Sequence, residues 1–222
     1  MKTLDKKLEL ELIRELIVQN IKEVSGGLWF YSVIHYGNYG NDGVRKEWDE
    51  MRWMYNKDHI RNKVHPYLRR LLKEHFKVEC LYFTLERHQG SLERIEEGEY
   101  TQYGDEKEGK YHTNILISPI SDDLLENPHP KLSRLWDEPG RMGIPIHSLQ
   151  YNEDLIDLKI DLINSCLRKC PYVNRYTPSV KTQVLESVDD LYNTGHYTLK
   201  DITRKGLDFM DVLDTQNSDI QH

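Results

Sequence analysis

The sequence predicts an α+β fold, with an antiparallel sheet of about four or five strands and helices packed on one face. Three observations predict it. Leu28–Ile34 is rich in aromatic and β-branched residues, as strands are, and Lys110–Ser118 has the two-residue period of a sheet strand. Glu153–Lys169 instead repeats its apolar residues at helical spacing. Val78–His88 precedes the Lys110–Ser118 strand without an intervening helix, so these two strands can pair antiparallel.

The composition is that of a water-soluble globular protein, with 38% hydrophobic and 30% charged residues. At 222 residues the chain is long enough for one sizeable core. No apolar run approaches a membrane span, and the charged N-terminus resembles neither a signal nor a transit peptide. We therefore expect a cytoplasmic protein with no membrane partner. The net charge of −7 argues against nonspecific coating of nucleic acid but leaves room for a local basic groove.

Three cysteines, Cys80, Cys166 and Cys170, are too few and too apolar in context for a disulfide framework. Cys166 and Cys170 have helical spacing, but no matching pair of metal ligands lies near them in the sequence. We expect buried free thiols in a reducing compartment.

The chain divides into three predicted parts. Residues 1–25 contain an amphipathic helix, Leu4–Val24, that ends at a Ser-Gly-Gly sequence. This helix either caps the main domain or mediates self-association, so a homo-oligomer is one of two alternatives. Residues 26–210 are expected to form the main domain. Residues 211–222 are expected to form a polar tail that frays from Asp214 onward.

The first half of the main domain alternates strand and helix. After the Leu28–Ile34 strand, Arg45–Phe76 has the periodicity of a helix in two pieces around Pro66. This helix is the most basic part of the chain, and its cations either form a solvated face or contact phosphates. The Val78–His88 strand follows, and then Gln89–Gly109, a polar and acidic loop or hairpin tip.

The second half begins with a short helix around Leu132–Trp136 and a fourth strand, Ile144–Leu149, whose Pro145 places it at a sheet edge. The helix Glu153–Lys169 follows.

Ser179–Tyr192 is predicted to be a further helix, because four apolar residues recur there at helical spacing. Asn193-Thr194-Gly195 is expected to end this helix, and a short helix resumes from His196 to Lys205.

The pleat of two adjacent strands brings together a candidate metal site. If Leu85 and Thr113 face the core, then Glu86, His112 and Asn114 share the opposite face. A carboxylate, an imidazole and an amide oxygen form a plausible hard-cation site, and their oxygen-rich character favours Mg²⁺ or Mn²⁺ over Zn²⁺. His88, two residues along the same strand face, is the alternative ligand. The simpler alternative is that His112 is only a satisfied surface histidine.

A tyrosine and a lysine, Tyr197 and Lys200, have the spacing that places both on one helix face. Tyrosine is a poor nucleophile at neutral pH, so a nearby metal and cation would matter by polarising a phosphate that it attacks.

This order of parts resembles the HUH endonucleases, the replication initiators of rolling-circle plasmids and of single-stranded DNA viruses and phages. Their first motif is a hydrophobic strand before a long helix, as in Leu28–Ile34 and Arg45–Phe76. Their second is a His-hydrophobic-His strand, which Tyr111–Ile117 resembles, preceded in many members by an acidic residue, matched by Glu86. Their third is Tyr-x-x-Lys on a helix, as in Tyr197–Lys200. The resemblance covers roughly residues 28 to 206.

The resemblance implies an RRM-like or ferredoxin-like sheet and a metal-dependent enzyme that nicks single-stranded DNA. Tyr197 would attack the phosphate and form a 5′-phosphotyrosine link, with Lys200 orienting the phosphate and Tyr192 as the alternative nucleophile. Glu86, His112 and Asn114 would hold Mn²⁺ or Mg²⁺. The implied partners are single-stranded DNA or an origin hairpin and a host or plasmid helicase, in the cytoplasm of a bacterial cell that carries the plasmid or phage.

Two other functions remain open. Asn114 stands where most of these enzymes have their second histidine, although viral members with Gln there resemble this form. A catalytically weakened or inactive nucleic-acid-binding or regulatory protein on the same fold is therefore one alternative. An interaction protein that works through its acidic segment, Glu93–Glu108, is the other.

Overall fold

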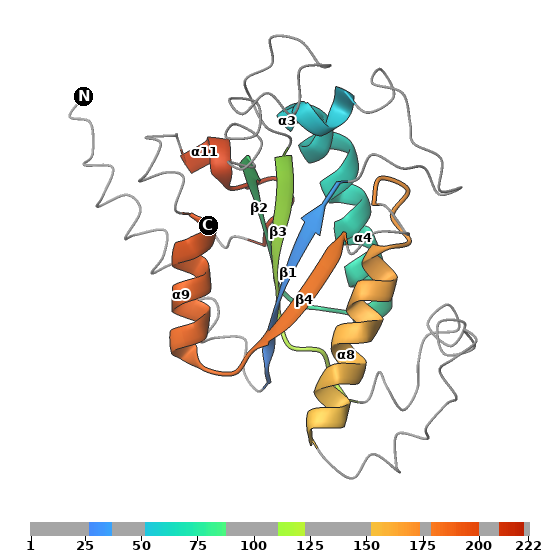
Figure 1. Cartoon of the computed structure of the whole chain (residues 1–222), viewed down its shortest axis with the longest axis vertical. Helices are drawn as coiled ribbons and strands as arrows, with labels where there is room; N and C mark the ends of the chain where they lie inside the picture. Colours follow the sequence, from blue (N-terminus) through green and yellow to red (C-terminus); the bar gives the residue numbers. More distant parts are fainter. Residues whose placement is uncertain are drawn as a thin grey trace, which may run out of the picture.

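A four-stranded antiparallel sheet forms the centre of the protein (Figure 1). The computed structural model describes residues 27–36, 52–87, 111–122, 152–173, 179–199 and 209–219. The strand order is β2-β3-β1-β4, and each neighbouring pair is antiparallel. The predicted antiparallel α+β fold is thereby confirmed. The strands are β1 (Trp29–His35), β2 (Leu81–Arg87), β3 (Tyr111–Ile117) and β4 (Val180–Leu185).

The helices lie on both sides of this sheet. The long helices α4 and α8 lie together on one side, whereas α9 and α11 lie on the other (Figure 1). The predicted arrangement, with helices on one face only, is therefore right for the two long helices but not for the shorter two. The described helical elements are η1 (Arg52–Tyr55), α3 (Lys57–His59), η2 (Ile60–Val64), α4 (His65–Phe76), α8 (Asn152–Leu167), α9 (Val188–Thr198) and α11 (Phe209–Val212).

Pro66 explains why the helix before β2 is irregular. Proline has no N–H to donate within a helix, so it is best accommodated in a first turn. Pro66 occupies that place in α4, and the turn before it, η2, is π-helical. The two pieces predicted around Pro66 are thus joined by a π turn. The helix ends at Lys77, whose φ of 49° is left-handed, a conformation common just after a helix.

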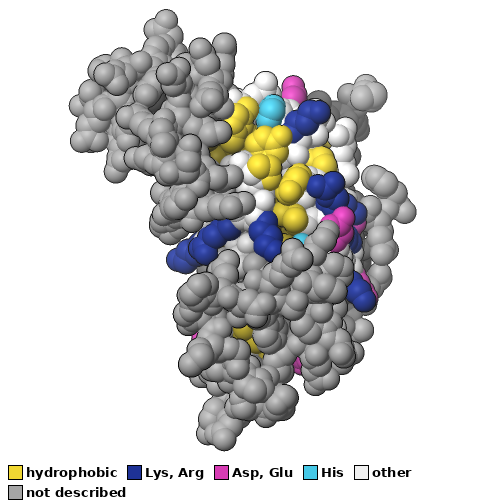
Figure 2. Space-filling model, turned by 90° about the vertical axis from the view of Figure 1, so that its right-hand side faces the viewer, with side chains coloured by type: hydrophobic (Ala, Val, Ile, Leu, Met, Phe, Trp, Pro, Cys, Tyr) yellow, Lys and Arg dark blue, Asp and Glu magenta, His cyan; other side chains and the backbone are white. Residues whose placement is uncertain are grey.

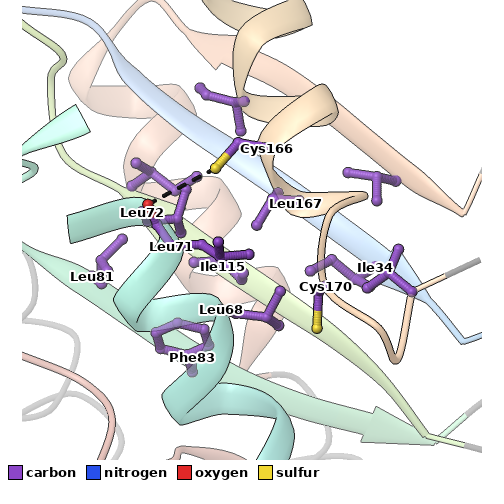
Figure 3. Packing of buried hydrophobic residues seen from close by; sticks show 14 of the residues in the cluster. Ile34, Leu68, Leu71, Leu72, Leu81, Phe83, Ile115, Cys166, Leu167 and Cys170 are labelled. Carbon is purple, nitrogen blue, oxygen red and sulfur yellow. Dashed lines mark hydrogen bonds between the residues drawn. The ribbon is translucent and has the colours of Figure 1, made fainter. Parts of the chain in front are cut away.

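The main core lies between the sheet and the two long helices (Figure 3). Leu68 of α4, Leu167 of α8 and Ile115 of β3 are among its fully buried members. The predicted free, buried thiols are confirmed for all three cysteines. Burial raises the pKa of both Cys166 and Cys170 to about 12, so these thiols are inert packing groups at neutral pH.

Figure 2 shows the face over this helical layer, where hydrophobic side chains lie between Lys and Arg side chains. On α4, the Arg70 guanidinium lies 4.8 Å from the centre of the Tyr67 ring. Trp53 is partly buried and packs edge-on against the Tyr172 ring, with 5.3 Å between the ring centres. These aromatic residues belong to the edge of the core.

The fourth strand is β4, in a segment for which the sequence analysis predicts a helix, and that prediction is wrong for Val180–Leu185. Val180 and Val184 are four residues apart, which fits a helix, but they also alternate with the exposed Lys181 and Gln183. Strand pairing with β1 decides the matter: Ser32 and Thr182 are cross-strand partners, and their hydroxyl oxygens lie 2.7 Å apart.

Helix α9 starts only at Val188, where Ser187 and Asp190 form a capping box. It continues through Asn193-Thr194-Gly195 to Thr198, so the predicted break at this sequence is wrong. A glycine inside a helix costs only about 1 kcal/mol relative to alanine. The strong start and the packing of the helix override that cost.

The C-terminal segment is folded onto the edge of the sheet rather than frayed, so the prediction of fraying is wrong for Asp214–Asp219. We call residues 209–219 the C-terminal strap. The backbone N–H of Asp214 donates to the Phe83 carbonyl at 2.9 Å, and that of Asp219 donates to the Leu81 carbonyl at 2.8 Å. The strap therefore pairs with the outer edge of β2, which would otherwise expose unpaired backbone groups.

Four cations of the basic helical stretch bind the strap. Arg69 donates to the Asn217 carbonyl at 2.9 Å, and Lys73 lies 2.9 Å from an Asp219 carboxylate oxygen. The other two contacts are Lys57 with Asp211 and Arg61 with the Leu213 carbonyl. The sequence predicts that these cations either face solvent or contact phosphates. In the structure these four residues contact the C-terminal strap instead.

A buried chain of hydrogen bonds joins the strap to β3. Asp214 lies 2.6 Å from His65 Nδ1, His65 Nε2 lies 2.9 Å from Thr113 Oγ1, and Thr113 Oγ1 lies 2.6 Å from the Tyr36 hydroxyl. Asn217 also donates to Asp214, at 2.6 Å.

One proton arrangement satisfies this chain. Neutral His65 donates from Nδ1 to the Asp214 carboxylate and accepts from Thr113, which accepts from Tyr36. Burial lowers the pKa of His65, against the opposing effect of Asp214. Burial acts to raise the pKa of Asp214, but the hydrogen bonds from His65 and Asn217 outweigh it and the pKa is lowered. The pair is therefore a neutral imidazole beside a carboxylate at neutral pH.

Several predicted elements lie outside the described residues. They are the N-terminal helix 4–24, the loop 89–109, the short helix around 132–136 and the strand 144–149. None of the helices within the described ranges is both long and apolar enough to cross a membrane.

Candidate functional site

The strand register places three candidate ligands on one face of the sheet. Glu86 of β2 is paired with His112 of β3, and Asn114 lies one step along the same face, opposite Thr84. The parity argument from the sequence is confirmed: these side chains share the face opposite the main core. Their role as metal ligands stays a prediction. We call this side of the sheet the open face.

The three side chains are buried and in contact. His112 Nε2 lies 3.1 Å from Glu86 Oε2, and Asn114 Nδ2 lies 3.4 Å from the same oxygen. Their exposed fractions are 6% for Glu86, 8% for His112 and 1% for Asn114. One carboxylate oxygen of Glu86 is therefore in contact with both the His112 imidazole and the Asn114 amide.

Asn114 supplies the observation that fits a cation. Its Oδ1 is buried and, among the described residues, has no hydrogen-bond partner, which is a costly state for an acceptor. Rotating the amide by 180° exchanges Oδ1 and Nδ2. The Asn114 oxygen would then face Glu86, and the two oxygens with the His112 nitrogen form a donor set of the kind that suits Mg²⁺ or Mn²⁺.

Within the described ranges, no group of three His, Cys, Asp or Glu side chains is arranged to hold a metal ion. A site on the open face therefore depends on the Asn114 amide as a ligand. His88, the alternative ligand, lies outside the described residues.

His35 is a neighbour that the sequence analysis misses. It is paired with His112 in the register, and the centres of the two rings are 5.4 Å apart. The predicted strand ends at Ile34, one residue too early. The alternation of Tyr31, Val33 and His35 would have placed this imidazole on the open face.

Tyr197 lies at the end of α9 with 54% of its surface exposed. It borders a groove of about 730 Å³ between α9 and β4, together with Tyr31 of β1 and Gln183 of β4. Glu186 and Asp190 are the acidic side chains of this lining, which contains no Lys or Arg among the described residues. Lys200 and the side chain of Tyr192 lie outside the described residues, so their roles stay predictions.

Tyr31 lines the groove and lies on the same sheet face as the candidate ligands, where it pairs with Leu116, four residues along β3 from His112. Its pKa is raised, first by burial and then by the charges of Glu86 and Tyr197. Its phenol is therefore within electrostatic reach of both side chains. The Tyr31 hydroxyl is buried and has no hydrogen-bond partner among the described residues.

A second, smaller apolar cluster packs on the open face of the sheet. Leu199, just after α9, and Val212 of α11 pack there against Trp29, Tyr31, Tyr82 and Leu116 of the sheet. The two short helices thus flank the open face (Figure 1), and α9 brings Tyr197 to its border.

Comparison with known proteins found no matching family model, no matching curated protein and no matching solved structure. The chemistry of the site therefore rests on its own residues.

Proposed function

We propose that this protein is a metal-dependent, tyrosine-using nickase of single-stranded DNA that initiates rolling-circle replication. The observation that carries the proposal is the shared face of Glu86, His112 and Asn114, bordered through Tyr31 by the groove of Tyr197. A nucleophile together with a hard-cation site is one arrangement that promotes attack on a phosphodiester.

The topology supports the same proposal. The described elements follow the order strand, helix, strand, strand, helix, strand, and the sheet order is β2-β3-β1-β4. This is the split β-α-β arrangement of ferredoxin-like folds, the type that the HUH resemblance implies.

The reaction is a transesterification. The Tyr197 oxygen forms a bond to phosphorus and loses its proton to solvent, while the bond from phosphorus to the 3′ oxygen breaks and that oxygen takes up a proton. A divalent ion held by Glu86, His112 and Asn114 would draw charge from the phosphate oxygens. Lys200 would orient the phosphate. The exposure of Tyr197 lets a DNA strand reach it.

The nucleophile is tested with a randomised pool of single-stranded 40-mers and Mn²⁺. The wild type should form a covalent protein–DNA adduct that survives denaturation. Tyr197→Phe should form none, whereas Tyr192→Phe is the matched control and should keep the adduct. An adduct retained by Tyr197→Phe and lost by Tyr192→Phe would transfer the role to Tyr192.

The metal site is tested with Glu86→Gln. This variant keeps the shape of the side chain but removes the anionic ligand, so cleavage should be lost at low millimolar Mg²⁺ and partly rescued by Mn²⁺. Thermal unfolding without metal should hardly change. Full Mg²⁺-dependent cleavage by Glu86→Gln would exclude this residue as a ligand.

A second candidate function is a regulatory nucleic-acid-binding protein without catalysis. Its motivation is the Asn114 amide, which donates to Glu86 and thus gives a contact that needs no ion. This candidate predicts salt-dependent DNA binding without strand cleavage. Calorimetric titration with Mn²⁺ separates the two: micromolar binding that is lost in His112→Ala supports the enzyme, and no binding supports the regulator.

The helicase partner, the bacterial cytoplasm and self-association through residues 1–25 belong to the same proposal. Light scattering of a chain that lacks these residues tests the last of them.

A further inference from the structure

Tyr31 of β1 and Tyr36, just after β1, are both buried, but their hydroxyl groups differ in hydrogen bonding. The Tyr36 hydroxyl, on the core side, lies 2.6 Å from Thr113 Oγ1. The Tyr31 hydroxyl, on the open face, has no hydrogen-bond partner among the described residues, although the side chain is only 6% exposed. A buried hydroxyl without a partner destabilises the free protein, and a role in binding or catalysis is one explanation for such a group.

The location of Tyr31 indicates which ligand that is. The residue lines the groove with Tyr197, and its phenol is within electrostatic reach of Glu86 as well. In the proposed reaction, a phosphate attacked by Tyr197 enters the groove that Tyr31 also lines. A buried hydroxyl without a partner in that lining is a donor that such a phosphate can use.

The charges around the groove make a neutral donor useful. Glu186 and Asp190 line the groove, and the described lining has no Lys or Arg to offset their charge. The two carboxylates repel a phosphodiester in the groove, and an O–H group that points at its oxygens offsets part of that repulsion. Burial keeps the Tyr31 phenol protonated across the neutral range, because its pKa is raised.

We propose that Tyr31 is a further catalytic residue, whose O–H donates a hydrogen bond to a non-bridging oxygen of the scissile phosphate. This inference rests on the proposed nickase function. Negative charge on the phosphoryl oxygens must be held while Tyr197 attacks, and a fixed donor in a buried site stabilises it without reorganisation.

The test uses Tyr31→Phe in the full chain with Mn²⁺ and the randomised 40-mer pool. Phenylalanine keeps the ring and removes only the hydroxyl. The melting temperature without DNA should stay the same or rise, because an unpaired buried oxygen disappears. The rate of adduct formation should fall by about 10²–10³-fold, the usual effect of losing one such donor.

Two matched variants complete the experiment. Tyr82→Phe removes a phenol from the same face and the same cluster but outside the groove lining, and its rate should match the wild type. Tyr36→Phe removes a hydroxyl with a partner, so its melting temperature should fall while its rate, measured well below that temperature, stays unchanged.

A phosphorothioate at the mapped cleavage position gives a readout that a structural role would not move. Replacing the contacted oxygen by sulfur should slow the wild type and have a smaller effect on Tyr31→Phe.

A Tyr31→Phe rate within twofold of the wild type would overturn the inference and leave the nickase function standing. A fall in its melting temperature as large as that of Tyr36→Phe would also overturn it. Absence of any adduct in the wild type would remove the proposed function and this inference together.

Discussion

The two faces of the sheet differ in how their buried polar side chains are hydrogen-bonded. On the core side, Ser32, Thr182 and Asn164 form one chain of hydrogen bonds, at 2.7 Å each. Thr113 belongs to another, with His65 and Tyr36.

On the open face the Tyr31 hydroxyl, Thr84 Oγ1 and Asn114 Oδ1 are all buried, and none has a partner among the described residues. Polar groups inside a protein are normally paired, since leaving one unpaired costs about 1–3 kcal/mol. Three such atoms lie on one face, the one that also carries Glu86 and His112. The core side pairs its polar groups within the fold, whereas the open face has the unpaired groups on which the proposed function rests.

The largest effect should come from breaking the core-side chain at Asp214. Asp214→Ala leaves His65 Nδ1–H and Asn217 without their acceptor. It should lower the free energy of unfolding by roughly 2–6 kcal/mol, because each buried donor left unpaired costs about 1–3 kcal/mol, as measured by urea denaturation. Asp219→Ala is the control, because Asp219 is 21% exposed, and it should cost clearly less. If both variants lose the same free energy of unfolding, the buried hydrogen-bond chain stabilises the fold no more than the partly exposed Asp219 contacts do.

The same chain should make stability fall in mild acid. The pKa of His65 is lowered in the folded protein, so the unfolded chain binds its proton first. The stabilisation is complete above the unfolded pKa of about 6.5 and is lost progressively as the pH falls below it. The lowered pKa of Asp214 adds a further loss below about pH 4. Denaturation from pH 8 to 5, compared with His65→Gln, measures the first loss. If the free energy of unfolding of His65→Gln falls with pH as steeply as that of the wild type, His65 is not the cause of the loss.

Thr182→Val sharpens the comparison on the core side. The substitution keeps the shape of the side chain and removes an oxygen that bonds both Ser32 and Asn164. It should cost about 1–3 kcal/mol of unfolding free energy.

Thr84→Val is the same change on the open face, and its effect should be the smallest. Thr84 is 4% exposed and its Oγ1 has no partner among the described residues. Its stability should change by about 0.5 kcal/mol or less, in either direction. If chemical denaturation shows the two threonine variants to be equally destabilised, the contrast between the faces is wrong.

The sequence predicts the first three strands and the open-face residues because strand alternation is a local signal. Glu86, His112 and Asn114 follow from parity alone once β2 and β3 are recognised. β4 is harder, because Val180 and Val184 fit both a helix and a strand, and pairing with β1 decides.

The strap escapes prediction for a different reason. Asp214 and Asn217 are residue types that normally face water. Their burial depends on His65 and Arg61, roughly 150 residues earlier in the chain. Tyr31 looks like one more aromatic strand residue, and only the absence of a partner for its hydroxyl distinguishes it.

The strap also has a consequence for how the chain is made. The backbone N–H groups of Leu81 and Phe83 in β2 donate hydrogen bonds to the side chains of Asp219 and Ser218, which lie 138 and 135 positions later in the chain. During synthesis on the ribosome β2 therefore leaves the exit tunnel long before the segment that covers its edge. For that interval the nascent chain carries an open strand edge, the kind of surface that joins one chain to another. A chaperone that covers the β2 edge during that interval would protect the nascent chain from aggregation, and slow translation after β3 would lengthen the interval.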